Sequence, residues 1–181
     1  SLNTAPLHAG KHAYCEKPFA LNSADGAAVL ALAKKKNLLV GSAPDTFFGS
    51  GIQTARKVID DGAIGRPVAA LAFMMCRGHE SWHPNPGFYY QPGGGPVLDM
   101  GPYYITDLVN LLGPVARVAA ITSSLRKQRT ITSQPKNGQT IPVEVATHAA
   151  GTLEFVNGTL VTVVLSFDIA RYRHAPIELY G

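Results

Sequence analysis

The chain has 181 residues, 46% of them hydrophobic, and 16 Lys+Arg against 12 Asp+Glu give it a formal net charge of +4. This length and composition fit one globular domain, or one domain with a piece of a second. No apolar run reaches the roughly 18 residues that a membrane span needs. The first residues lack the layout of a secretory signal, and the charge is too scattered for a nucleic-acid surface. We therefore expect a cytoplasmic protein that binds neither membrane nor nucleic acid.

Residues 1–44 alternate strand and helix signals. An apolar strand is expected at His12–Cys15 and a second at Leu38–Gly41. Between them Asn22 is a helix cap, and the helix that follows ends at Asn37. Two buried strands joined by a helix are typical of a parallel α/β layer. These residues therefore predict the C-terminal part of a doubly wound, Rossmann-type nucleotide-binding domain.

Residues 45–181 have a different pattern, which predicts a second, α+β domain. A helix over Ile52–Asp61 and a strand over Val68–Met75 precede a long loop, Gly78–Gly95, whose aromatic residues we expect to be buried. A helix over Pro96–Leu112 follows. The remaining strands are expected at Val115–Ser123, Val143–Phe155, Thr159–Phe167 and Ile177–Tyr180, with a hairpin turn at Asn157-Gly158. Because the sequence stops inside the last strand, we expect the domain to be truncated.

Several charged and sulfur-containing residues carry no functional signal. Arg126, Lys127 and Arg129 fall in a polar stretch and are expected to be solvated. Cys15 and Cys76 are too few for a disulfide framework. His12 and Cys15 have the spacing of metal ligands, but no second pair completes a zinc site, so no metal is expected.

The tripeptide Glu16-Lys17-Pro18 follows the first predicted strand. Ligands in open α/β sheets bind outside the carboxyl ends of the strands. At that place Lys17 can donate to a substrate hydroxyl or stabilise an alkoxide as hydride leaves, and Glu16 can accept from a ribose hydroxyl. Pro18 fixes the turn and can be cis. The alternative is an ordinary turn with two solvated charges.

A second group of residues lies in and after the long loop. Asp99 and Tyr103 are one turn apart on the predicted helix and so share a face. Gly93-Gly94-Gly95 before that helix allow the backbone to approach a ligand closely. A polyol needs hydroxyl partners around a flat apolar wall, and this stretch offers Trp82, His83, Asn85, Gln91, Asp99 and Tyr103. The alternative is that Asp99 only lies near the positive helix start and Tyr103 belongs to the core.

Taken in order, five segments resemble the Gfo/Idh/MocA family of glucose–fructose oxidoreductase, inositol dehydrogenase and their relatives. They are Ala9–Pro18, Ile59–Pro67, Gly93–Gly101, Leu111–Val115 and Gly151–Gly158. The resemblance implies a nucleotide-binding domain followed by an open, mainly antiparallel sheet with helices on one face. It also implies NAD or NADP as cofactor, a sugar, cyclitol or other polyol as substrate, and a homo-oligomer formed through the antiparallel sheet.

The resemblance also implies roles for particular residues. Lys17 matches the lysine that assists hydride transfer, Glu16 a glutamate near the nicotinamide ribose, and Asp99 an aspartate that holds substrate. With Lys17, Tyr103 and His83 are candidates for the proton step. Trp82, Asn85 and Gln91 are expected to bind substrate beside Asp99, and Pro18 is expected to contact the cofactor beside Glu16 and Lys17.

The sequence departs from the family pattern in three places. No Gly-x-Gly-x-x-Gly follows a strand, so the phosphate turn is missing from this chain. Tyr103 stands where the family often has histidine, and an unperturbed phenol titrates near about 10, too high for a base near neutrality. Asp45-Thr46-Phe47 stands where Arg-Phe is often seen.

Two functions from different classes are consistent with these residues. The first is an NAD(P)-dependent dehydrogenase of sugar-like alcohols. The second is a non-catalytic sugar-binding or dimer-forming module that keeps the fold, which Tyr103 and the missing phosphate turn favour. A partial gene product, inactive by itself, is a third possibility.

Overall fold

The computed structural model describes residues 4–181, and the chain divides into two compact units between Asp45 and Thr46. This division lies one residue after the expected boundary.

The first unit is a strand–helix–strand layer preceded by the short helix α1 (Thr4–His8). Strands β1 (Ala13–Cys15) and β2 (Val40–Ser42) are parallel, with Tyr14 opposite Gly41. Helix α2 (Ser23–Lys35) joins them and buries Val29 and Ala33 with Leu7 of α1. The predicted parallel layer is therefore confirmed.

Both predicted ends of α2 are explained by side-chain and backbone chemistry. The Asn22 side-chain oxygen accepts a hydrogen bond of 2.8 Å from the Asp25 N–H, which satisfies one of the free amides of the first turn. Asn37 has φ +52°, a left-handed conformation in which asparagine is favoured after a helix.

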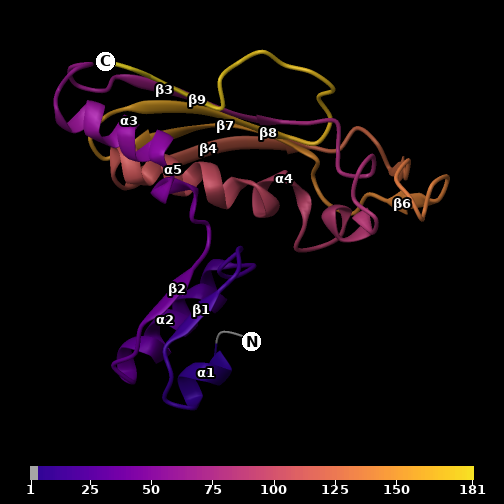
Figure 1. Cartoon of the computed structure of the whole chain (residues 1–181), viewed down its shortest axis with the longest axis horizontal. Helices are drawn as coiled ribbons and strands as arrows, with labels where there is room; N and C mark the ends of the chain where they lie inside the picture. The colour runs from indigo at the N-terminus through magenta and orange to yellow at the C-terminus, as the bar shows by residue number, and fades with distance from the viewer. Residues whose placement is uncertain (1–3) are drawn as a thin grey trace. The chain divides into compact units, whose positions relative to one another are not determined.

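The second unit is a five-stranded sheet with helices on one face (Figure 1). The strand order is β4-β7-β8-β3-β9; β3 and β8 are parallel and the other neighbours antiparallel. This confirms the open, mainly antiparallel sheet that the resemblance implied. The elements in chain order are η1 (Thr46–Phe48), α3 (Ser50–Asp60), β3 (Ala69–Met75), η2 (Pro86–Tyr90), α4 (Gly95–Asp99), α5 (Gly101–Leu112), β4 (Val115–Ser123), β5 (Gln128–Thr130), β6 (Thr140–Pro142), β7 (His148–Phe155), β8 (Leu160–Ser166) and β9 (Ile177–Tyr180).

Burial alternates along the central strand β8. Val161, Val163 and Leu165 are buried in one core with residues of α5 such as Leu108. Full burial of each such side chain contributes about 1.5–3 kcal/mol to the stability of the fold. Leu160, on the opposite face, is 52% exposed. Within the second unit this face of the strand is open, because the helices lie on the other side of the sheet (Figure 1).

The helix expected over Pro96–Leu112 is interrupted at Met100, so that α4 ends at Asp99 and α5 begins at Gly101. Pro102 explains the interruption, because its ring removes an N–H from the helix and clashes with the preceding turn. Asp99 and Tyr103 therefore lie on two different helices, and the expectation of one shared helix face is wrong.

Two other predictions needed correction in the second half of the chain. The stretch around Arg129, expected to be a polar loop, contains the two-stranded hairpin of β5 and β6. The strand expected from Val143 begins only at His148. Among residues 4–181, no helix is long and apolar enough to cross a membrane.

Candidate active site

Lys17 lies directly after β1, at the carboxyl end of the parallel pair in the first unit. It is half-buried, its backbone N–H is 3.3 Å from Glu16 Oε2, and the Lys17-Pro18 bond is cis. The neighbouring His12 accepts the Leu39 N–H through Nδ1 at 2.9 Å. The metal-like spacing of His12 and Cys15 thus has a local structural explanation. Among residues 4–181, no three His, Cys, Asp or Glu side chains gather as metal ligands.

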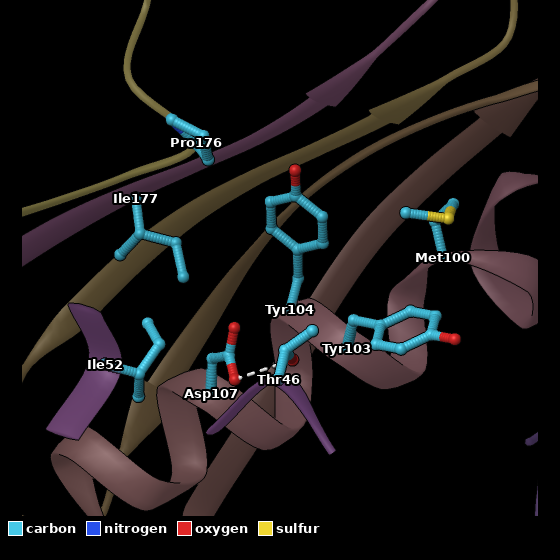
Figure 2. Close-up of a pocket in the computed structure, with 8 residues that line it drawn as sticks. All are labelled: Thr46, Ile52, Met100, Tyr103, Tyr104, Asp107, Pro176 and Ile177. Atoms are coloured by element: carbon cyan, nitrogen blue, oxygen red, sulfur yellow. Dashed lines mark hydrogen bonds between the residues drawn. The ribbon is translucent and has the colours of Figure 1, made fainter. Parts of the chain in front are cut away.

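A cavity of about 560 Å³ lies in the second unit beside the junction of α4 and α5 (Figure 2). Predicted residue Tyr103 lines it, whereas Asp99 does not. The lining is mostly apolar, with hydroxyl and carboxyl groups from α5 and η1. The lining residues are Thr46, Ile52, Met100, Tyr103, Tyr104, Asp107, Pro176 and Ile177.

Asp107 is a carboxyl group of this cavity that the sequence analysis did not identify. It is buried, and its Oδ1 accepts a hydrogen bond of 3.1 Å from Thr46 Oγ1, as Figure 2 shows. Burial raises the pKa of Asp107, and the Thr46 hydroxyl offsets this in part. Thr46 belongs to the segment that departs from the Arg-Phe pattern. In this chain a neutral hydroxyl, rather than an arginine at that position, faces the buried carboxyl.

Asp99 faces a histidine that the sequence analysis also missed. Asp99 Oδ2 is 3.3 Å from His79 Nε2, and the two side chains are only 15% and 10% exposed. Trp82 donates its indole N–H to His79 Nδ1 at 3.2 Å. The proton of the neutral His79 ring is therefore on Nε2 and faces the carboxylate.

Aromatic rings surround the His79–Asp99 pair. The His79 ring lies 4.2 Å from Tyr89, 4.6 Å from Phe167 and 5.3 Å from Trp82, measured between centroids. Burial and the Asp99 charge raise the pKa of Tyr89. Trp82 is 60% exposed and Phe88 51%, so the expectation that the loop aromatics are buried is wrong for these two rings. The exposed face of Trp82 gives the site an apolar wall.

The loop that carries His79 is held by buried Arg129, which is 2% exposed. Its guanidinium donates to Glu80 Oε1 at 2.8 Å and to Asp168, and also to the carbonyls of Arg77 and Phe167. The expectation that Arg129 is a solvated charge is therefore wrong. Arg126 and Lys127, in contrast, are exposed as expected.

Tyr90 joins this network to His79. Its hydroxyl donates to Glu80 and accepts the His79 backbone N–H at 3.3 Å. Burial and the Glu80 carboxylate raise the pKa of Tyr90. Gly78 has φ +102°, and a Cβ there would lie 2.6 Å from the Tyr90 hydroxyl oxygen and 2.8 Å from Arg129 Nη1. Only glycine fits beside this network.

The other predicted loop residues are arranged differently. His83 packs edge-on against Tyr89, and its Nδ1 accepts the Asn85 N–H at 3.0 Å. Asn85 Oδ1 accepts from Lys136 Nζ at 2.6 Å. Gln91 is exposed. The structure thus brings His83 and Trp82 into the aromatic group around His79, and leaves Asn85 and Gln91 at the surface.

The glycine run has a local packing role. A side chain at Gly94 would lie 2.7 Å from the Tyr89 carbonyl oxygen, and one at Gly95 would lie 2.9 Å from that of Ala146. Close contact between α4, η2 and a neighbouring loop thus accounts for these two glycines.

Residues 52–181 match the family model described as GFO/IDH/MocA C-terminal domain. An uncharacterized oxidoreductase of Schizosaccharomyces pombe is 29% identical over 152 residues, 77% of this chain and 40% of that protein. Levoglucosan dehydrogenase of Pseudarthrobacter phenanthrenivorans is 25% identical over 194 residues, 98% of this chain and 49% of that protein.

A solved structure agrees with these sequence matches. Levoglucosan dehydrogenase in complex with NADH and L-sorbose aligns with a TM-score of 0.80 and 25% identity, over 99% of this chain and 48% of that one. The chain thus spans half or less of the length of these relatives.

Proposed function

We propose that this chain, which belongs to the GFO/IDH/MocA family, is part of an NAD(P)-dependent oxidoreductase that acts on a sugar, cyclitol or related polyol. The observation that carries the proposal is the Asp99 carboxylate, held against His79 within a ring of aromatic side chains. The named relatives support the substrate class, since levoglucosan dehydrogenase is among them. Because the chain spans half or less of these relatives, the activity is proposed for the whole protein.

The His79–Asp99 pair is suited to binding a hydroxylated ring. A carboxylate accepts hydrogen bonds from sugar hydroxyls, and bonds to a charged group are the stronger ones. His79 Nε2 lies 3.3 Å from Asp99 Oδ2, so the imidazole ring and the carboxylate are held side by side. The exposed Trp82 ring supplies the flat apolar surface on which the C–H face of a sugar packs.

Three residues of the first unit are suited to the reactive end of the cofactor. Glu16, Lys17 and Pro18 follow a strand of a parallel pair, where open α/β sheets bind nucleotides. Nicotinamide, when bound, supplies the hydride acceptor or donor. Lys17 polarises the substrate oxygen and stabilises its negative charge. In the second unit the hydroxyl of Tyr103, which lines the cavity, is our candidate for relaying the alcohol proton: its oxygen accepts that proton as its own O–H proton passes to water.

The open face of the sheet supports the homo-oligomer that we propose. Ile121, Ala150, Val164 and Phe73 form one cross-strand row on four neighbouring strands. Ile121 is 81% exposed. A second copy of the protein would cover the exposed part of this apolar row, at Ile121 and Ala150. The cytoplasmic location also remains a prediction.

The test begins with cofactor binding by the full-length protein. Titration with NADH and with NADPH, followed by fluorescence, should show saturation for at least one of them. Lys17→Met should then reduce kcat by orders of magnitude while the protein still folds and still binds the cofactor. An absence of binding at millimolar cofactor would favour the alternative, a sugar-binding or dimer-forming module. Unchanged kcat in Lys17→Met would remove Lys17 from the mechanism.

A further inference from the structure

A second cavity, of about 670 Å³, lies where the parallel strands β3 and β8 end. The segments that leave these two strands form its walls. Ligands in α/β sheets bind outside the carboxyl ends of parallel strands, so its position is that of a binding site. The lining residues are Met75, Cys76, Arg77, Ala170, Arg171, Tyr172 and Arg173.

Three arginines line this cavity and give it a positive charge. The guanidinium groups of Arg77, Arg171 and Arg173 have no hydrogen bond or ion pair to any residue between 4 and 181. The carboxylates of the same segments, Glu80 and Asp168, are both bound to Arg129. No carboxylate lines the cavity.

The same two segments also build the His79–Asp99 site. Arg77 is two residues before His79, which faces Asp99 at 3.3 Å. Phe167, three residues before Ala170, packs its ring 4.6 Å from that of His79. The two sites therefore share the segments that follow β3 and β8.

We propose that the three arginines bind an anionic group of the substrate, a carboxylate or a phosphate. The inference rests on the proposed function and narrows its substrate class from neutral polyols to sugar acids or phosphorylated sugars. Guanidinium groups present paired N–H donors that match the two oxygens of these anions. A neutral polyol needs no such charge. The apolar part of the lining, Met75 and Ala170, accepts the carbon chain next to the anion.

The experiment measures anion binding apart from turnover. The full-length protein is titrated calorimetrically at low ionic strength with inorganic phosphate, acetate, D-glucose, D-glucuronate and D-glucose 6-phosphate. The double variant Arg171→Gln/Arg173→Gln tests the cavity. Arg126→Gln, which removes an equally exposed arginine outside it, is the matched control.

We expect the anionic probes to bind more tightly than D-glucose. The double variant should weaken their binding at least tenfold, the loss expected for one charge-assisted hydrogen bond, and Arg126→Gln should leave it unchanged. Stronger binding of phosphate and D-glucose 6-phosphate indicates a phosphorylated substrate, and stronger binding of acetate and D-glucuronate a sugar acid. Anions that do not bind, or that bind equally well to the double variant, would overturn the inference.

NADH titration of the same variants separates this inference from the proposed function. Its Kd should be unchanged in the double variant, because the cofactor is assigned to the first unit. NADH binding without anion binding would refute only the anion site. Anion binding that the arginines control, without NADH or NADPH binding, would leave the anion site standing and refute the oxidoreductase.

Discussion

Removing Arg129 should destabilise the second unit more than removing any exposed arginine. In Arg129→Met the carboxylates of Glu80 and Asp168, each with a side chain only 11% exposed, lose their buried cation. Breaking a buried ion pair by removing one partner costs about 3–5 kcal/mol, mainly because the other charge stays buried. The total free energy of unfolding of a globular domain is about 5–15 kcal/mol. We therefore expect loss of about a fifth or more of the unfolding free energy.

The assay is chemical unfolding of the full-length protein, followed by circular dichroism and by fluorescence, since Trp82 lies in the loop that Arg129 holds. Arg126→Met, on the exposed neighbour, should change the unfolding free energy by no more than about 0.5 kcal/mol. Adding Glu80→Gln to Arg129→Met should recover part of the loss, because one uncompensated charge is removed. If Arg129→Met costs less than about 1 kcal/mol, the network does not hold the loop as described.

Three further predictions concern the site and the sheet. His79→Gln should lower kcat/KM for the sugar about ten- to hundredfold with unchanged NADH affinity, whereas His8→Gln, at an exposed histidine outside the site, should have a small effect. The pKa of Asp107 is raised, so its contribution to stability is complete below its unfolded value of 3.8 and is lost as pH rises through the folded value. Between pH 4 and pH 8 the unfolding free energy of Asp107→Asn should therefore rise relative to that of the natural protein. Parallel curves of the two free energies against pH would contradict this. Ile121→Lys, which puts a charge on the open face of the sheet, should shift sedimentation toward monomer; an unchanged oligomer would place the interface elsewhere.

The fold was largely predictable because its signals are local. Asn22 and Asn37 mark the two ends of α2 through capping and a left-handed φ, and both effects act within a few residues. Asn157-Gly158 likewise marks the turn of the hairpin between β7 and β8. The missed interruption at Met100 was also local, since Gly101-Pro102 indicates it. The apolar periodicity of Pro96–Leu112 concealed that signal.

The site was predicted only in part because its geometry depends on distant contacts. Nothing near Arg129 in the sequence shows that Glu80 and Asp168, 49 and 39 residues away, enclose it. His79 was overlooked beside His83 for the same reason, because its partner Asp99 lies 20 positions further on. Gly78 carried a usable signal, since a single glycine before a polar pair often marks a close backbone approach.

The measurement that tests the central claim most directly is transfer of deuterium to the cofactor. The full-length protein is incubated with NAD or NADP and sugars, sugar acids and sugar phosphates deuterated at their secondary alcohol carbons, and the reduced nicotinamide is examined by mass spectrometry. We predict that one label appears on the nicotinamide ring, and that Lys17→Met nearly abolishes its transfer. If no substrate of these classes transfers its label although the protein is folded and binds cofactor, the oxidation of sugar-like alcohols by this protein is contradicted.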